Sequence, residues 1–271
     1  MAEATQIPMP VAPPRMSRLI DMAIARGPAL AAVAGLLGLW QLVVWGFEVP
    51  EYMAPSPLAV LRAFGDNAGV LWLNFWPTFL EAALGFVAGN LVAIALAVWF
   101  VHSSTAERAF FPIAVFVNTI PIIAVAPILV LIFGNGFAPK IIIAGLICFF
   151  PTLVNMVRGL KAVSPATLDL MRVLSASKSE IFWKVRLQSS LPFLFAALKI
   201  ASTTCVIGAI VAEWIGSNYG LGALIIEATF NFRSPLLYAT VFTAALLAVV
   251  MFALVSFAES KLVRWKSGDV H

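Results

Sequence analysis

The chain has 271 residues, of which 62% are hydrophobic and only 11% are charged. An ordinary soluble domain has roughly half and a quarter, respectively, so this composition excludes that class. The net charge is +4, but the basic residues are not grouped with aromatic residues that could stack on bases, so we expect no nucleic-acid partner. Long runs that almost lack charge predict an all-α polytopic protein of the lipid bilayer.

Taken in chain order, six apolar runs are long enough to cross a bilayer core, which needs about 20 residues. We therefore predict six transmembrane helices, at residues 28–47, 75–101, 110–133, 141–157, 192–215 and 236–258. They form a transmembrane domain over residues 28–258, with terminal tails at 1–27 and 259–271. Residues 48–73 are too polar to span and predict a surface helix, and residues 216–235 predict a re-entry loop.

The positions of Lys and Arg predict the orientation of these spans. With both termini in the cytoplasm, thirteen basic residues fall on the inner side and three on the outer side. The three outer residues are Arg62, Lys140 and Arg233, while Lys199 lies inside the fifth span. Such a bias is typical of cytoplasmic loops, so we predict cytoplasmic termini and a cytoplasmic loop between the fourth and fifth spans.

That loop, S-P-A-T-L-D-L-M-R-V-L-S-A-S-K-S-E-I-F-W-K-V-R-L-Q-S-S-L-P at 164–192, is a polar island in an apolar sequence. Ser164 followed by Pro165 predicts a helix start, with a hydroxyl N-cap and proline at the first helical position. Ser177 and Glu180 have the spacing of a capping box and predict a second start. Glu180 and Lys184 form a favourable i, i+4 pair. The pattern predicts a helix, a tight turn at 175–177 and an amphipathic helix with an apolar stripe at Ile181, Phe182 and Val185.

This island resembles the cytoplasmic loop of permease subunits of bacterial ATP-binding-cassette importers, whose pattern is E-A-A-x3-G-x9-I-x-L-P. On this chain the acid falls on Asp169, the two alanines on Leu170 and Met171, and the glycine on Ser175. The last three positions of the pattern fall on Val185, Leu187 and Gln188. Most positions are therefore substituted, several of them conservatively.

Four further segments resemble the nitrate, sulfonate and taurine branch of that family, and they occur in the right order. They are M-A-P-S-P-L-A-V-L-R-A-F at 53–64, I-P-I-I-A-V-A-P-I-L-V-L-I-F-G at 120–134, F-F-P-T-L-V-N at 149–155 and A-E-W-I-G-S-N-Y-G-L-G-A-L-I at 212–225. Together they cover most of residues 50–258.

The resemblance implies a non-catalytic permease subunit in the bacterial inner membrane that forms the pathway for a small solute. It implies three partners: ATPase subunits, a second permease copy or a related permease, and a periplasmic or lipid-anchored substrate-binding protein. The loop at 161–191 would couple to the ATPase through Asp169, Arg172, Ser175, Ala176, Ser177, Lys178, Phe182 and Leu187. Loss of the glycine and proline of the pattern raises the hypothesis of a heterodimer, with the homodimer as the default.

Within the spans, a few polar positions are candidates for the pathway. Pro121 and Pro127 interrupt the third span, which predicts either a broken helix with Asn118 and Thr119 facing the pathway or an ordinary kinked helix. Glu81 and Glu213 are acids near the outer face. Snorkelling or a hydrogen bond to a neighbouring helix explains Glu81, whereas the resemblance implies that Glu213 braces the outer loop and borders the pathway. Lys199 is expected to snorkel toward the cytoplasm.

No catalytic set can be assembled, because the two histidines, His102 and His271, lie in a loop and at the terminus. We therefore expect no metal site and no cofactor. The sequence has no G-x-x-x-x-G-K-[ST] motif, so ATP hydrolysis must come from a partner. The alternative function is an ATP-independent secondary transporter or channel, which would be expected to have paired intramembrane charges or inverted repeats.

Overall fold

The computed structural model describes residues 15–263, and within this range the chain is helical without a β-strand. The elements in chain order are α1 Arg15–Gly46, α2 Pro57–Asp66, α3 Ala68–His102, α4 Ser104–Thr119, α5 Ile122–Phe133, α6 Phe137–Lys161, α7 Pro165–Val173, α8 Lys178–Ile181, the π-helical turn η1 Phe182–Arg186, α9 Leu187–Glu213, α10 Leu221–Phe230 and α11 Ser234–Leu262. The predicted all-α class is confirmed. The predicted tails at 1–14 and 264–271 lie outside the described residues.

Four continuous helices are long and apolar enough to cross a membrane: α3, α6, the run from α8 through α9, and α11. The pair α4 and α5 is bent by 96° and could supply a fifth span. The apolar part of α1, Leu30–Gly46, is shorter than these helices. The described residues thus give four or five spans by length and composition, and the predicted count of six is not confirmed.

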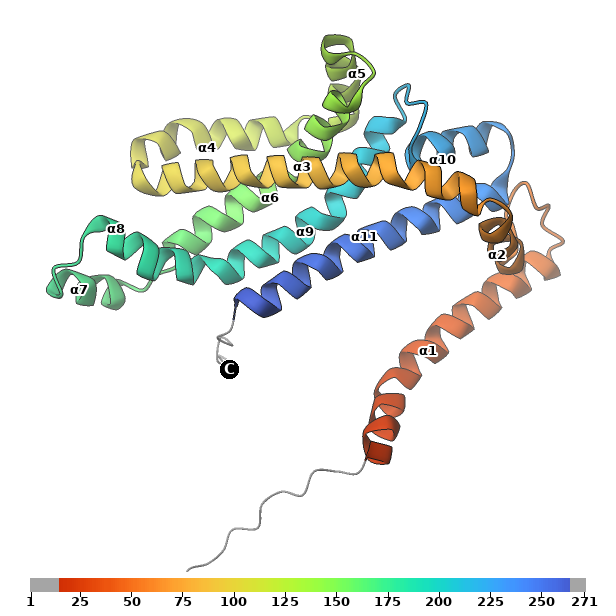
Figure 1. The fold of residues 1–271 in the computed structure, drawn as a ribbon, viewed down its shortest axis with the longest axis horizontal. Coiled ribbons are helices and arrows are strands. Elements are labelled where there is room, and N and C mark those ends of the chain that lie inside the picture. Colours follow the sequence, from red (N-terminus) through yellow and green to blue (C-terminus); the bar gives the residue numbers. More distant parts are fainter. Residues whose placement is uncertain (1–14, 264–271) are drawn as a thin grey trace, which may run out of the picture.

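The centre of the bundle is α6, which packs against α3 on one side and α9 on the other (Figure 1). Small residues allow this close approach. A Cβ added to Gly89 of α3 would collide with the backbone of Gly145 on α6, and one added to Gly208 of α9 would lie 2.9 Å from the Cα of Ala144 on α6. Glycine and alanine at such contacts are typical of helices packed in a membrane.

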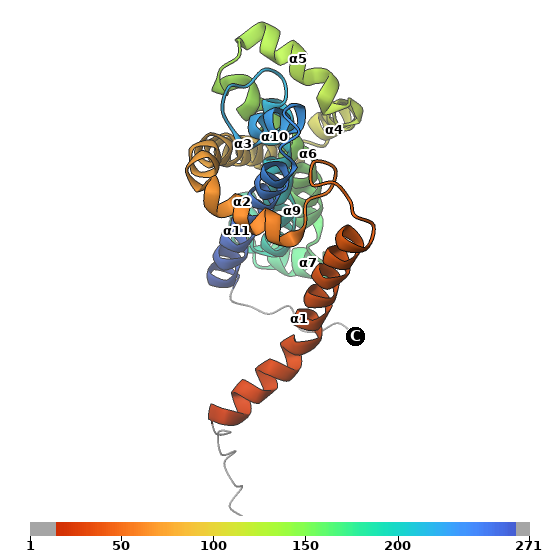
Figure 2. The same cartoon turned by 90° about the vertical axis from the view of Figure 1, so that its right-hand side faces the viewer.

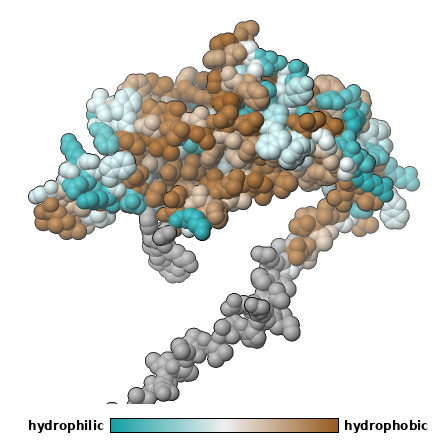
Figure 3. Space-filling model, viewed as in Figure 1, coloured by the Kyte–Doolittle hydropathy of each residue, from teal (hydrophilic) through white to brown (hydrophobic). Residues whose placement is uncertain are grey.

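The helix ends separate into two groups, at opposite ends of the bundle (Figure 1). One end holds α7, α8 and the α3–α4 connection, and an ion pair between Lys161 Nζ and Glu107 Oε1 at 2.5 Å ties α6 to α4 there. The other end holds α2 and α10. Figure 3 shows an apolar band across the middle of the visible face with hydrophilic residues at the two ends, as expected for a bilayer-spanning surface.

Two segments depart from this bundle (Figure 2). Helix α1 runs away from it, and the contact of Trp40 with Tyr238 and Phe242, with ring centroids 5.9 and 6.4 Å apart, joins it to α11. Helix α5 projects on the other side. The break that precedes it lies at Ile120 and Pro121, whereas Pro127 lies inside α5 and does not end it.

Candidate functional site

The polar island forms the predicted pair of helices, which we call the two-helix unit (residues 164–186). The Ser164 hydroxyl caps α7 by accepting a hydrogen bond from the Thr167 N–H at 3.2 Å, and Pro165 occupies the first turn. The second start is also confirmed. Ser177 and Glu180 form a reciprocal capping box, in which the Ser177 N–H donates to Glu180 Oε2 at 3.0 Å.

The backbone of the turn between the helices explains why the family pattern has a glycine at this position. Ser175, at that position, has a φ of +52°. The Ala176 N–H donates to the Met171 carbonyl at 3.0 Å and the Ser175 N–H to the Arg172 carbonyl at 2.9 Å, which together make a Schellman motif. Glycine adopts this left-handed conformation without steric cost, whereas serine does not.

Charged residues of the two-helix unit are arranged around its exposed faces. Asp169 pairs with Arg172 at 2.7 Å, and Lys184 pairs with Glu180 at 3.0 Å. In the sequence, Glu180 precedes the apolar part of the helix that continues into α9. Its hydrogen bond from the Ser177 backbone, with help from Lys184, lowers the pKa of Glu180 to about 2. Lys178 is exposed beside this pair.

The second helix of the unit continues into the fifth span, so α8, η1 and α9 make one helix of 36 residues. Gln188, unlike the pattern's proline, has a backbone N–H for this helix, which runs on through Pro192. The helix that contains the predicted fifth span therefore begins before residue 192, at Lys178. Phe182 is buried, and Leu187 packs beside it on a cluster that includes Phe100, Met156 and Leu160.

The tip of the unit exposes large apolar side chains. Val173 is 81% exposed, Leu174 65% and Leu170 58%, and Trp183 on the second helix is 61% exposed. Helices α7 and α8, which belong to this unit, lie at one end of the bundle (Figure 1). An apolar surface at that position, rimmed by charges, is typical of a protein contact.

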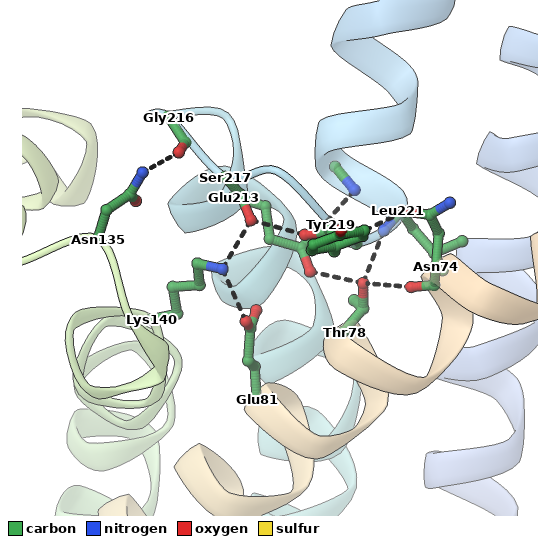
Figure 4. A network of polar contacts seen from close by, with 12 residues as sticks. Asn74, Thr78, Glu81, Asn135, Lys140, Glu213, Gly216, Ser217, Tyr219 and Leu221 are labelled. Atoms are coloured by element: carbon green, nitrogen blue, oxygen red, sulfur yellow. Dashed lines mark hydrogen bonds and ion pairs between the residues drawn. The ribbon is translucent and has the colours of Figure 1, made fainter.

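The two predicted acids of the outer half lie in one buried polar network at the opposite end (Figure 4). Glu213 Oε1 accepts a hydrogen bond from the Thr78 hydroxyl of α3 at 2.6 Å, and Glu213 Oε2 accepts one from the Gly222 N–H of α10 at 2.6 Å. Thr78 Oγ1 also accepts the Leu221 N–H at 2.8 Å. Glu213 therefore ties α9 to α3 and to the start of α10, and it is 1% exposed rather than at an open surface.

The second half of this network was missed by the sequence analysis. Lys140, assigned there to an outer loop, is buried in the first turn of α6. Its Nζ lies 2.9 Å from Glu81 Oε1 and donates to Ser217 Oγ at 2.7 Å. Among the described residues Lys140 is the cation that forms an ion pair with this buried carboxylate. A buried acid implies a nearby base, and Lys140 is the one predicted outer cation that directly precedes a long apolar run.

Lys199 also has a partner that the sequence analysis did not name. Its Nζ lies 2.5 Å from Glu259 Oε2 on α11, and both side chains are more than two-thirds buried. Lys199 thus forms an ion pair with the last turn of α11, at the end of that helix where the sequence predicts the cytoplasm.

The break between α4 and α5 carries the other predicted pathway residues. Asn118, Thr119 and Pro121 are exposed on the described chain, and the Thr119 hydroxyl donates to the Phe116 carbonyl at 2.7 Å. Asn118 borders a pocket of about 150 Å³ whose other lining residues are apolar and include Phe149 and Phe150.

Within residues 15–263, no group of His, Cys, Asp and Glu side chains could hold a metal ion. Cys148 and Cys205 are buried free thiols.

Comparison with known proteins identifies a family whose model matches this chain. The family described as "Binding-protein-dependent transport system inner membrane component" matches residues 89–266. A probable ABC transporter permease of Haemophilus influenzae is 37% identical over 83% of this chain and 90% of its own length. The formylaminopyrimidine transport permease ThiX of Halalkalibacterium halodurans is 32% identical over 85% of this chain and 94% of its own length.

Two more distant similarities concern the branch and the fold. The putative aliphatic sulfonates transport permease SsuC of Bacillus subtilis is 26% identical over 89% of this chain and 88% of its own length, as the segments in the sequence predict. A structure of the MetNI methionine ABC transporter in an inward-facing conformation aligns with a TM-score of 0.54 at 22% identity. The alignment covers 78% of this chain and 97% of that chain. At this identity the last similarity concerns the fold alone.

Proposed function

The chain belongs to the family of binding-protein-dependent transport system inner membrane components and is a permease subunit of an ATP-driven importer; from this premise we propose how its parts divide the work. The two-helix unit receives force from an ATPase subunit, the outer polar network holds the extracytoplasmic end together, and the α4–α5 region borders the pathway. The mechanism is alternating access, in which closure of the ATPases moves the unit and the spans tilt with it.

The observation that carries the coupling role is the exposed apolar tip of the two-helix unit. Val173 and Leu174 would cost free energy in water, roughly 25 cal/mol for each Å² of apolar surface left unburied. The unit is anchored to the bundle by Phe182, and its second helix is continuous with α9. A push on the second helix is therefore transmitted into a span without an intervening loop, and only the tight turn at 175–177 separates that helix from the tip.

The polarity of the pocket beside Asn118 supports a proposal about the solute. A sulfonate or nitrate ion would require a cation or several donors, and this pocket offers one amide between apolar and aromatic side chains. Phe149 and Phe150 suit a planar ring. Because ThiX, a formylaminopyrimidine permease, is also more similar to this chain than SsuC, we take a small nitrogen heterocycle as the transported class.

The pathway itself would form between two permease chains. The α4–α5 segment projects from the bundle and exposes Asn118, Thr119 and Pro121. A second copy of this chain, related by a two-fold axis, is the simplest partner for that surface. Glu213, although predicted to border the pathway, would act as a brace because it is buried between α3 and α10.

The topology that this function needs has both termini in the cytoplasm and the two-helix unit on the same side. The grouping of helix ends supports it, because α7, α8 and the α3–α4 connection share one end of the bundle. Six crossings then require α1 as the first span and α4–α5 as the third. Cysteines at Ser179 and Asn218, in a variant lacking Cys148 and Cys205, would react with an impermeant reagent from opposite sides of the membrane. Labelling of both from one side would exclude this topology.

The experiment for the solute class uses proteoliposomes that contain this chain, its ATPase and its binding protein. ATP hydrolysis is measured with the binding protein added alone and with formylaminopyrimidine, an alkanesulfonate or nitrate. We expect stimulation by the pyrimidine above the unloaded level and none by the two anions. Stimulation by an anion alone would overturn the proposed solute class without affecting the assignment as a permease.

A further inference from the structure

A pocket of about 390 Å³ lies at the inner end of the bundle, between the end of α3 and the two-helix unit. Its walls combine cationic and apolar side chains, and none of the lining residues is acidic: they are Val101, His102, Leu168, Arg172, Lys178, Ile181, Phe182 and Arg186. Arg172, Lys178 and Phe182 were predicted to couple to the ATPase, and the structure places all three around this pocket. We propose that it binds the phosphate headgroup of an anionic phospholipid of the inner leaflet.

The charge of the pocket favours an anionic ligand. Neither Lys178 nor Arg186 forms an ion pair with any described residue, and Arg186 makes only a long hydrogen bond, 3.4 Å, to the Leu160 carbonyl. Of the nearby acids, Asp169 offsets the charge of the pocket residue Arg172, and Glu180 pairs with Lys184, which does not line the pocket. Positive charge is therefore left without a partner, and basic pockets between spans on the cytoplasmic side suit phospholipid headgroups.

The position of the pocket favours a lipid. His102 is the last residue of α3, and Arg186 immediately precedes α9, so the basic side chains lie where the apolar parts of these spans end. Val101, Ile181 and the buried ring of Phe182 form an apolar wall that acyl chains could contact.

The local helix geometry keeps two of these residues on one wall. Phe182 and Arg186 are the first and last residues of η1, and the Leu187 N–H donates to the Phe182 carbonyl across that turn. A π-helical turn inside a longer helix is rare and is frequently found at functional sites. Here it brings an aromatic ring and a guanidinium group to the same pocket.

The pocket can be occupied while the ATPase is docked. On α7, Leu168 and Arg172 are four residues apart and share the face toward the pocket. Leu170 and Val173, at the exposed tip, point about 150° away from that face at 100° per residue. A lipid headgroup and an ATPase would thus contact opposite sides of α7, which favours a lipid over a protein partner for this pocket. The proposal rests on the cytoplasmic location of the unit, which belongs to the proposed function.

The test measures lipid binding to the full-length chain alone, by native mass spectrometry with phosphatidylglycerol and phosphatidylcholine. The variant K178Q/R186Q removes two pocket charges. The control R158Q/K184Q removes two charges at the same end of the bundle, at positions that do not line the pocket. Since each basic residue near a lipid surface contributes about fivefold, we expect phosphatidylglycerol affinity to fall roughly 5- to 30-fold in the first variant and less than about twofold in the second.

Further binding measurements distinguish a lipid site from a free-phosphate site and from a protein contact. The charge-preserving variant K178R/R186K should bind phosphatidylglycerol like the wild type, which shows that charge and not misfolding causes the loss. Equal affinity in the wild type and K178Q/R186Q would overturn the proposal, as would equal binding of phosphatidylcholine. Displacement of the lipid by glycerol 3-phosphate at comparable concentration would identify a free-phosphate site instead.

A separate pull-down with the ATPase completes the comparison. If K178Q/R186Q binds lipid like the wild type but no longer retains the ATPase, the pocket belongs to a protein contact and the lipid proposal is wrong. The lipid measurement itself contains neither the ATPase nor the binding protein. Its result is therefore independent of whether the chain imports the proposed solute.

Discussion

The carboxylate of Glu213 accepts a hydrogen bond from the Thr78 hydroxyl at 2.6 Å, joining the last residue of α9 to the third turn of α3 at the outer side of the bundle. The same carboxylate receives the Gly222 N–H, so one side chain fixes two helices and the start of α10. Gly220, with a φ of +119°, lies against this carboxylate, and a Cβ there would collide with it. The outer loop is therefore built around Glu213.

A double-mutant cycle measures this bond. Thr78→Val and Glu213→Gln should each lower the thermal midpoint of the detergent-solubilised chain, and together they should lower it by less than the sum. For buried hydrogen bonds between membrane helices the coupling energy is about 0.6–1.7 kcal/mol. The control pairs Thr78→Val with Glu227→Gln, an exposed position on α10, and should be additive. Additivity in the Thr78 and Glu213 cycle would show that this bond does not stabilise the outer end.

The ion pair of Lys140 and Glu81 gives a second prediction. Lys140→Met leaves the Glu81 carboxylate buried without its cation, and breaking a buried pair in this way costs about 3–5 kcal/mol. We expect the variant to show a strongly lowered unfolding midpoint or a much reduced yield of folded protein. The double variant Lys140→Met with Glu81→Leu, which removes both charges, should recover most of the loss. A double variant as unstable as the single one would contradict this explanation.

The close contact of α3 with α6 is tested at Gly89. Gly89→Ala places a methyl group against the backbone of Gly145, so the two helices must separate and the folded yield should fall sharply. The matched control is Gly69→Ala, in the same helix, where an added Cβ meets no atom within 4 Å. Fluorescence-detected size-exclusion chromatography compares the two. Equal profiles would mean that α3 and α6 do not pack as described.

These contacts indicate what the sequence could and could not predict. The starts of α7 and α8 were predictable, because Ser164 with Pro165 and Ser177 with Glu180 satisfy local backbone donors within four residues. The bend between α4 and α5 was predictable in position from Pro121, but its angle depends on packing against α6. Its second proline, Pro127, produced no break, since proline inside a membrane helix can be accommodated by its neighbours.

Partners distant in sequence could not be predicted in the same way. Glu81 and Glu213 were correctly singled out as unusual acids, but the cation that serves Glu81 lies 59 positions later, at Lys140. Hydropathy assigned Lys140 to a loop, because a charge at the end of an apolar run usually marks the water boundary. The apolar run at 28–47 was predicted as a span from its hydropathy. Hydropathy depends on length and composition only, so it could not predict how α1 packs against the other helices.

The turn of the two-helix unit provides a further prediction. Ser175 has a left-handed conformation that costs a non-glycine residue about 1–2 kcal/mol, and a β-branched residue more. Ser175→Gly should therefore keep or strengthen binding of the ATPase, and Ser175→Val should weaken it by roughly 5- to 30-fold, as measured by pull-down from detergent. The control is Ser179→Val, an exposed serine in α8. Equal retention of the ATPase by Ser175→Val and Ser179→Val would contradict the role given to this turn.

The most direct measurement of the central claim is uptake of labelled solute by proteoliposomes that contain this chain with its ATPase and binding protein. We expect uptake that requires ATP on the side of the membrane where the ATPase lies and requires the binding protein on the opposite side. The variant Val173→Asp with Leu174→Asp, which charges the exposed tip of the two-helix unit, should abolish uptake and ATPase co-purification while the unfolding midpoint stays unchanged. Uptake that proceeds without ATP, or that persists in this variant at the wild-type rate, would contradict the account of an ATP-driven permease coupled through residues 164–186.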